Sequence, residues 1–172
     1  MHIFARANRT FFAFIMGSIF TVGVSAQIDE IIVTANKREQ SLQDIPMTVS
    51  VATAEQIERS AIVDLMDLGA AVPTLRVNQL QNSAQTNFVI RGYGNGANNP
   101  GIEPAVGIYI DGVSRTRASS AIGDLPGVER VEVLSGPQST LFGKNASAGV
   151  ISITTKLPEK EFGGMVSAAV GN

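Results

Sequence analysis

The spacing of apolar and polar positions divides the chain into short β-prone runs that turn-forming residues separate. Apolar side chains alternate or cluster over a few positions instead of recurring at helical spacing, which is typical of strands. The runs that we expect to form strands are residues 28–35, 47–51, 75–77, 88–90, 106–111, 128–134 and 149–155. The last run carries neighbouring apolar side chains, which indicates a strand covered on both faces.

Short helices are expected between these runs. Thr53 and Gln56 have the spacing of a capping box, which predicts a helix beginning there. Asp64 is expected to cap a second helix that Pro73 ends, and residues 138–142 predict one further helical turn. Since short helices alternate with these strands, the sequence predicts an α+β domain with a mixed four- to five-stranded sheet.

The N-terminus has the pattern of an export signal. Arg6 and Arg9 precede an apolar run over residues 11–24, and small side chains around Ala26 predict cleavage after that residue. The run is shorter than the roughly 18–20 residues that span a bilayer, which argues against an anchor.

Composition excludes several kinds of chemistry. Cleavage leaves 146 of the 172 residues, with 11 basic and 15 acidic side chains, a formal charge of −4, and neither histidine nor cysteine. Without a basic block, no nucleic-acid partner is expected. Without His or Cys, a Ser-His-Asp triad, a cysteine nucleophile and the usual zinc sites are excluded, and no cofactor is expected. Asp111 with Glu129 or Glu132 is left as a glycosidase-type pair, but nothing fixes their separation, so we do not expect an enzyme.

Residues 28–35, IDEIIVTA, directly follow the export signal and form a β-prone segment behind an acidic pair. An extended segment offers unpaired N–H and C=O groups with which a partner's strand can pair. Residues 36–43 are polar and without periodicity, so we expect a linker to the folded domain. The alternative is that residues 28–35 are an ordinary first strand of the domain's own sheet.

Residues 91–101, RGYGNGANNPG, form a loop rich in glycine and asparagine. A phosphate-binding loop is disfavoured because no Gly-Lys-Ser/Thr follows and the loop does not open a helix. A turn-rich surface loop is therefore expected.

Five motifs, in this order, resemble the N-terminal plug of the TonB-dependent receptors of Gram-negative outer membranes. They are IDEIIVTA, which resembles the TonB box, then DIPMTVSVATAEQI, FVIRGYG, VGIYIDGV and VERVEVLSGPQSTLFGKNASAGVISITTK. The resemblance implies a signal peptide over residues 1–26, a TonB box and linker over 27–43, a plug domain over 44–157 and a first barrel strand over 158–172. A flexible C-terminal tail is the alternative for the last segment.

The resemblance implies the gating part of an outer-membrane receptor for energised uptake of a siderophore, a cobalamin or an oligosaccharide. The implied partners are the periplasmic domain of TonB, a barrel of about 22 strands and the small-molecule nutrient. The plug is not expected to transport without such a barrel. The alternative is a free periplasmic binding or signalling domain that docks a partner through its N-terminal strand.

The resemblance also implies three groups of site residues. The TonB box contains Asp29, Glu30, Ile31, Ile32, Val33, Thr34 and Ala35. Charged residues expected to seat the plug on the barrel wall, or else to mark the wet face of a strand, are Arg91, Glu129, Arg130 and Glu132. Polar residues of the ligand-facing loops are Asn82, Gln85, Asn87, Tyr93, Asn95, Asn98 and Asn99. Ser135 stands where the family usually has arginine, and serine cannot form a bidentate pair with a carboxylate.

Overall fold

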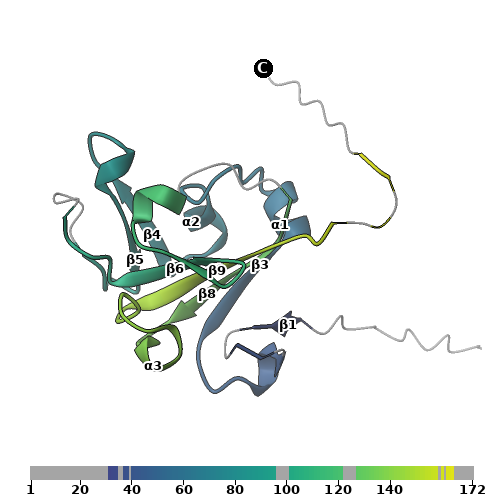
Figure 1. Cartoon of the computed structure of the whole chain (residues 1–172), viewed down its shortest axis with the longest axis horizontal. Helices are drawn as coiled ribbons and strands as arrows, with labels where there is room; N and C mark the ends of the chain where they lie inside the picture. The colour runs from purple at the N-terminus through teal and green to yellow at the C-terminus, as the bar shows by residue number, and fades with distance from the viewer. Residues whose placement is uncertain are drawn as a thin grey trace, which may run out of the picture.

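A five-stranded mixed sheet forms the centre of the molecule (Figure 1). The structure, a computed structural model, describes residues 31–34, 37–38, 40–95, 101–121, 127–158, 160 and 162–164. In spatial order the strands of the central sheet are β3 (Val49–Thr53), β8 (Val128–Ser135), β9 (Gly149–Thr155), β6 (Val106–Ile110) and β7 (Val113–Arg115). β6 and β9 run parallel, and the other neighbours are antiparallel. The predicted mixed sheet and α+β class are confirmed.

The β9 strand lies between β8 and β6, in the middle of this sheet. Val150 and Ile151 are both fully buried although they point to opposite faces. The prediction of a strand covered on both faces is therefore confirmed.

Two further strands form a separate hairpin beside the central sheet. β4 (Leu75–Gln79) pairs antiparallel with β5 (Thr86–Ile90), and the 3-10 turn η2 (Ser83–Gln85) connects them. Both strands were predicted, but pairing extends each of them toward the turn.

The helices are short, and none of those in the described residues is long and apolar enough to cross a membrane. α1 (Ala54–Arg59) has the predicted capping box: the Thr53 hydroxyl accepts the Gln56 N–H, and the Gln56 side chain accepts the Thr53 N–H. α2 (Leu68–Ala71) begins later than predicted, because the Asp64 carboxylate accepts N–H groups in a turn that precedes this helix. α3 (Ser139–Phe142) is the predicted helical turn, and the 3-10 turn η3 (Ala118–Ala121) was not predicted.

The described residues before β3, called the N-terminal segment from here on, form a third sheet. β1 (Ile32–Val33) pairs antiparallel with β2 (Gln40–Ser41), and the 3-10 turn η1 (Leu42–Asp44) follows. The Lys37 backbone, at a positive φ of 56°, closes the turn by donating its N–H to the Thr34 carbonyl. The segment expected to be a linker therefore folds back on β1 instead of leading away from it.

The central sheet packs a core on each face. The larger core lies between the sheet, α1, α2 and the β4–β5 hairpin. The smaller core contains Val33, Ile45, Tyr109, Leu134 and Val150, together with Ala146. The N-terminal segment therefore covers one face of the central sheet, as Figure 1 shows below β3 and β8.

Several predictions fall outside the described residues. The signal peptide, Asp29, Glu30 and Ala35 lie there, as do residues 165–172 of the expected barrel strand. Residues 162–164 have no regular secondary structure, and Phe162 is fully exposed.

Candidate functional site

The β1 strand pairs with β2 along one of its two edges, its inner edge. The opposite edge is its outer edge. Ile32 lies opposite Ser41, and the Leu42 N–H donates to the Ile31 carbonyl at 3.0 Å. In an antiparallel pair, successive residues direct their backbone groups to opposite edges. The backbone groups of Ile31 and Val33 therefore face β2, whereas those of Ile32 and the N–H of Thr34 face the outer edge.

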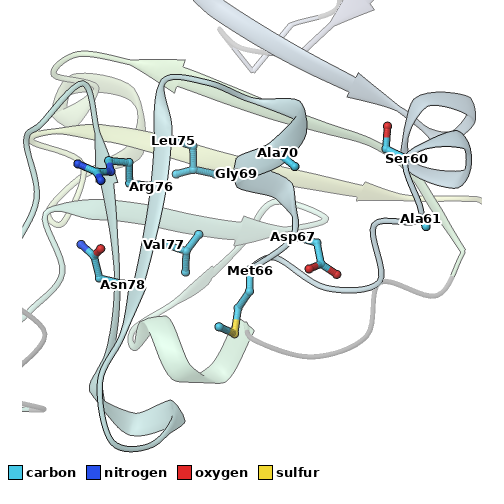
Figure 2. A pocket seen from close by; sticks show the side chains of 10 residues that line it. All are labelled: Ser60, Ala61, Met66, Asp67, Gly69, Ala70, Leu75, Arg76, Val77 and Asn78. Carbon is cyan, nitrogen blue, oxygen red and sulfur yellow. The ribbon is translucent and has the colours of Figure 1, made fainter.

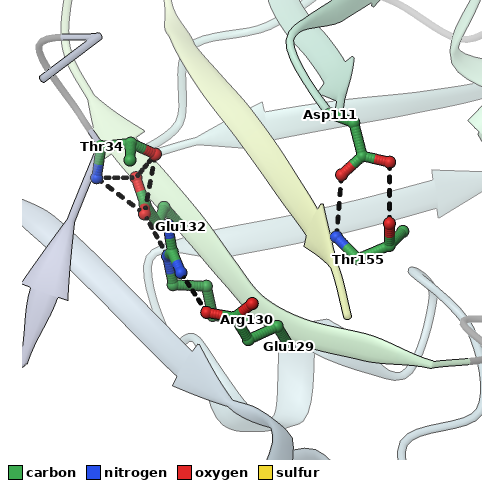
Figure 3. A network of polar contacts seen from close by, with 6 residues as sticks. All are labelled: Thr34, Asp111, Glu129, Arg130, Glu132 and Thr155. Carbon is green, nitrogen blue, oxygen red and sulfur yellow. Dashed lines mark hydrogen bonds and ion pairs between the residues drawn. The ribbon is translucent and has the colours of Figure 1, made fainter. Parts of the chain in front are cut away.

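At the outer edge Thr34 binds a carboxylate of the central sheet. Its N–H donates to the two oxygens of Glu132 at 2.9 and 3.1 Å, and its hydroxyl lies 3.2 and 3.4 Å from them (Figure 3). Glu132 is fully buried and also accepts the Arg130 Nε–H at 2.8 Å. Burying a carboxylate costs free energy unless it accepts hydrogen bonds. The bonds from Thr34 therefore stabilise Glu132 in its buried position, and the same bonds hold Thr34 in place.

Side-chain burial anchors the same strand. Val33 is 0% exposed and packs in the smaller core. Ile31 and Ile32 are 40% and 50% exposed. The strand therefore combines one buried anchor with two apolar side chains that a partner can reach.

The turn after β1 makes a further contact with α3. The Lys37 ammonium lies 5.3 Å from the centre of the Phe142 ring, within the range of a cation–π interaction. Tyr109 packs edge-on against the same ring, with centroids 5.0 Å apart, and donates its hydroxyl to the Phe142 carbonyl. Sequence reasoning missed these residues, although alternation along β6 places Tyr109 on the opposite face from Ile108.

Three of the four predicted seat residues lie together on β8. Arg130 bridges its neighbours, with Nη1 at 2.5 Å from Glu129 and Nε at 2.8 Å from Glu132. Arg91 is elsewhere: it follows β5, is exposed and has a positive φ of 52°. Glu132 differs from the expectation of a residue facing an outside wall, because β1 covers it.

Ser135 ends β8 in a buried position. Its N–H donates to the Thr48 carbonyl at 3.0 Å, which extends the pairing with the β3 side of the sheet. Within the described residues its hydroxyl has no hydrogen-bond partner. The serine therefore contributes through its backbone.

The predicted ligand residues are not gathered at one place. Asn82 and Gln85 lie at the η2 turn, whereas Tyr93 and Asn95 lie beyond the other end of β5, roughly 15 Å of strand away at about 3.3 Å per residue. Asn87 is not a loop residue: it lies inside β5 and is buried. Asn98 and Asn99 lie outside the described residues.

Some of these polar side chains stabilise the loops themselves. The Gln85 side chain accepts the Gln81 N–H at 3.3 Å, and the Asn95 amide donates to the Glu103 carbonyl. Tyr93, in contrast, is 73% exposed. Tyr93 therefore presents an exposed aromatic side chain to an incoming molecule.

The Asp111 carboxylate, considered from the sequence as half of a glycosidase-type pair, binds Thr155. Its two oxygens accept the Thr155 N–H at 2.8 Å and the Thr155 hydroxyl at 2.9 Å. Figure 3 shows this pair apart from the network around Glu132. Asp111 and Gly112 both have positive φ, so Asp111 closes the tight turn between β6 and β7.

A hollow of about 480 Å³ lies between the α1–α2 connection and β4 (Figure 2). Its polar lining includes Ser60, Asp67, Arg76 and Asn78. None of the predicted site residues lines it, so it is separate from the β1 site.

The comparison with protein families identifies the fold. The family model described as TonB-dependent Receptor Plug Domain matches residues 41–150. This chain belongs to the plug-domain family of TonB-dependent receptors, and the predicted family is confirmed.

Characterised relatives agree with this assignment. The chain is 32% identical over 149 residues to the vitamin B12 transporter BtuB of Vibrio vulnificus, covering 84% of this chain and 23% of the relative. It is 30% identical over 153 residues to the pesticin receptor of Yersinia pestis, covering 86% and 22%. It is 31% identical over 168 residues to the iron-regulated outer membrane virulence protein of Vibrio cholerae, covering 88% and 24%. The chain thus spans about a quarter of the length of these relatives.

Solved structures share the fold. The ferric yersiniabactin uptake receptor FyuA of Yersinia pestis superposes with a TM-score of 0.61 at 30% identity, covering 67% of this chain and 18% of the receptor. The ferripyoverdine receptor of the outer membrane of Pseudomonas aeruginosa gives 0.62 at 19% identity, covering 77% and 17%. The second likeness shows the fold alone. The predicted outer-membrane location agrees with that of these relatives.

Proposed function

We propose that this plug gates a receptor that imports a scarce nutrient, and that the periplasmic domain of TonB grips residues 29–35 to open it. One observation carries the proposal: among the described strands, β1 pairs with β2 and lies outside the five-stranded sheet. A pull on β1 therefore detaches the N-terminal segment without first breaking a pairing of the central sheet.

The contacts of β1 fit a releasable attachment. Burial of a valine side chain contributes roughly 1.5–3 kcal/mol. A hydrogen bond to a charged group contributes a similar amount, roughly 1.5–3 kcal/mol. Val33 and Thr34 thus supply stabilisation on the order of 3–6 kcal/mol. Contacts of this size are small enough for a pull to overcome.

The remaining partners follow from the family. We propose a surrounding barrel of about 22 strands, with the exposed Arg91 and Glu129 as the charges nearest to its wall. A siderophore, a cobalamin or an oligosaccharide is the proposed cargo class. The relatives named for vitamin B12 and for ferric yersiniabactin support the first two classes. We assign no catalytic role to the plug.

A photocrosslinking experiment tests the grip. A photoreactive residue replaces Ile32, and the purified periplasmic domain of TonB is added before irradiation. We expect a crosslinked product, because Ile32 lies within the segment that the partner grips and its side chain is 50% exposed. The matched control is Val113, an equally accessible apolar residue on the edge strand β7, which is 59% exposed. Equal crosslinking at both positions, or none at Ile32, would contradict the proposal.

A further inference from the structure

The Glu132 carboxylate occupies the place that a partner's strand would need. A strand added to the outer edge of β1 brings carbonyl oxygens to the N–H groups that point outward. The Thr34 N–H is one of these groups, and it already donates to both Glu132 oxygens at 2.9 and 3.1 Å. The carboxylate therefore substitutes for the carbonyl of an adjacent strand.

We propose that Glu132 is a built-in competitor for the partner strand: its carboxylate blocks the outer edge of β1 until Thr34 leaves it. The inference rests on the proposed function and adds a regulation to it. Docked β1 is closed to strand addition, and undocked β1 is open.

The surroundings of Glu132 explain why Thr34 binds to it again after a pull has separated the two residues. Glu132 faces the smaller core, and its pairing neighbours are Val51 on β3 and Ser152 on β9. Among the described residues, Thr34 and Arg130 donate hydrogen bonds to its carboxylate. When β1 leaves, the carboxylate keeps Arg130 and loses the donors of Thr34. Re-docking therefore satisfies a carboxylate that the open state leaves with fewer partners.

The competing arrangement is a partner that displaces β2. Val33 exchanges its backbone bonds with Gln40 on the inner edge, so a strand taking that edge leaves Thr34 on Glu132. The two arrangements predict different effects of removing the Glu132 charge.

Accessibility of the buried anchor measures undocking without any partner. The chain has no cysteine, so Val33→Cys in the whole chain gives a single reactive thiol whose maleimide labelling rate reports exposure. The Glu132→Gln substitution, added to the Val33→Cys chain, keeps the shape of the side chain but removes the charge that holds Thr34. We therefore expect maleimide labelling of the thiol at position 33 to become about tenfold faster. Glu129→Gln is the matched control: it also pairs with Arg130 but lies outside the contact with Thr34, so we expect less than a twofold change. Equal rates in the two variants would overturn the proposal.

A second variant covers the case in which Glu132→Gln fails to fold. Thr34→Val removes the hydroxyl from the Glu132 contact and leaves β8 unchanged, and we expect labelling about two- to fivefold faster. Circular dichroism checks that the central sheet is intact in each variant. An unchanged rate in folded Thr34→Val would overturn the proposal.

Binding of the periplasmic domain of TonB completes the test. We expect Glu132→Gln to raise the affinity for the periplasmic domain of TonB by about the same factor as the labelling rate, because both depend on the separation of Thr34 from Glu132. Faster labelling with unchanged affinity for the periplasmic domain of TonB would show that the partner displaces β2 at the inner edge of β1. This result would overturn the proposal that Glu132 competes with the partner strand. Absence of binding by every variant would overturn the proposed function, while the labelling rates still decide whether Glu132 holds β1.

Discussion

At the scale of single residues, three neighbouring side chains hold the N-terminal segment in three different ways. Val33 contributes apolar burial, Thr34 contributes hydrogen bonds to a buried carboxylate, and Lys37 lies over the Phe142 ring. Hydrogen bonds lose their strength over a shorter distance than apolar contacts do. We therefore expect Thr34 to separate before Val33 leaves its core.

Gly149 occupies a position in β9 that has no room for a side chain. A Cβ there would lie 2.4 Å from the Leu134 carbonyl oxygen and 2.7 Å from the Ile90 Cδ1. We expect Gly149→Ala to lower the free energy of unfolding by about 2–4 kcal/mol, measured by urea denaturation.

The control for this prediction is Gly69→Ala in α2. Its Cβ would meet the Leu75 carbonyl at 3.5 Å, an ordinary contact. Alanine is the better helix former, so we expect no loss, or a gain of up to about 1 kcal/mol. Equal losses in the two variants would contradict the steric argument.

At the scale of secondary-structure elements, α1 depends on its N-terminal cap. Thr53→Ala removes the hydroxyl that accepts the Gln56 N–H, and we expect a loss of about 1 kcal/mol in the free energy of unfolding. Thr53→Ser keeps this acceptor and should retain the stability of the natural chain. The same loss in both variants would show that the Thr53 methyl group, and not the cap, stabilises the helix.

The elements predicted correctly from the sequence are those whose signals are local. The capping box of Thr53 and Gln56 lies within one helical turn, and the apolar run of β9 needs no partner to be recognised. Turn residues such as Gly112 likewise act through their own backbone angles.

The start of α2 and the environment of Asn87 could not be predicted in this way. Asp64 and Asp67 are both residues of a type found at helix caps, but the Asp64 carboxylate accepts the Met66 and Asp67 N–H groups in a turn, and the helix begins only at Leu68. Asn87 disfavours a strand by itself, but pairing with Asn78 in the hairpin draws it into β5.

The candidate site could be predicted only in part, because some of its signals are local in the sequence and others depend on distant contacts. The strand character of β1 follows from Ile31, Ile32 and Val33. Its attachment does not, because Thr34 and Glu132 are 98 positions apart in the sequence. The charges along β8 are expected from the sequence either to seat the plug on a barrel wall or to mark the wet face of a strand, and only the packing of β1 shows that Glu132 is buried.

At the scale of the whole molecule, the plug consists of a central sheet with unequal cores on its two faces. The larger core is closed by helices and a hairpin that follow β3 in the sequence. The smaller core is closed partly by the N-terminal segment, which continues along the chain into β3 and binds Glu132 of β8 through Thr34. A pull from the N-terminus therefore reaches the smaller core first.

Stretching a single molecule tests this order most directly. Handles are attached through Ile31→Cys and Leu157→Cys, two exposed positions in a chain without cysteine. We predict a first low-force step that releases the chain up to β3, about 60–65 Å of contour length at roughly 3.3–3.6 Å per residue, followed by a separate rupture of the central sheet. A single rupture that unfolds the N-terminal segment and the central sheet together would contradict the account.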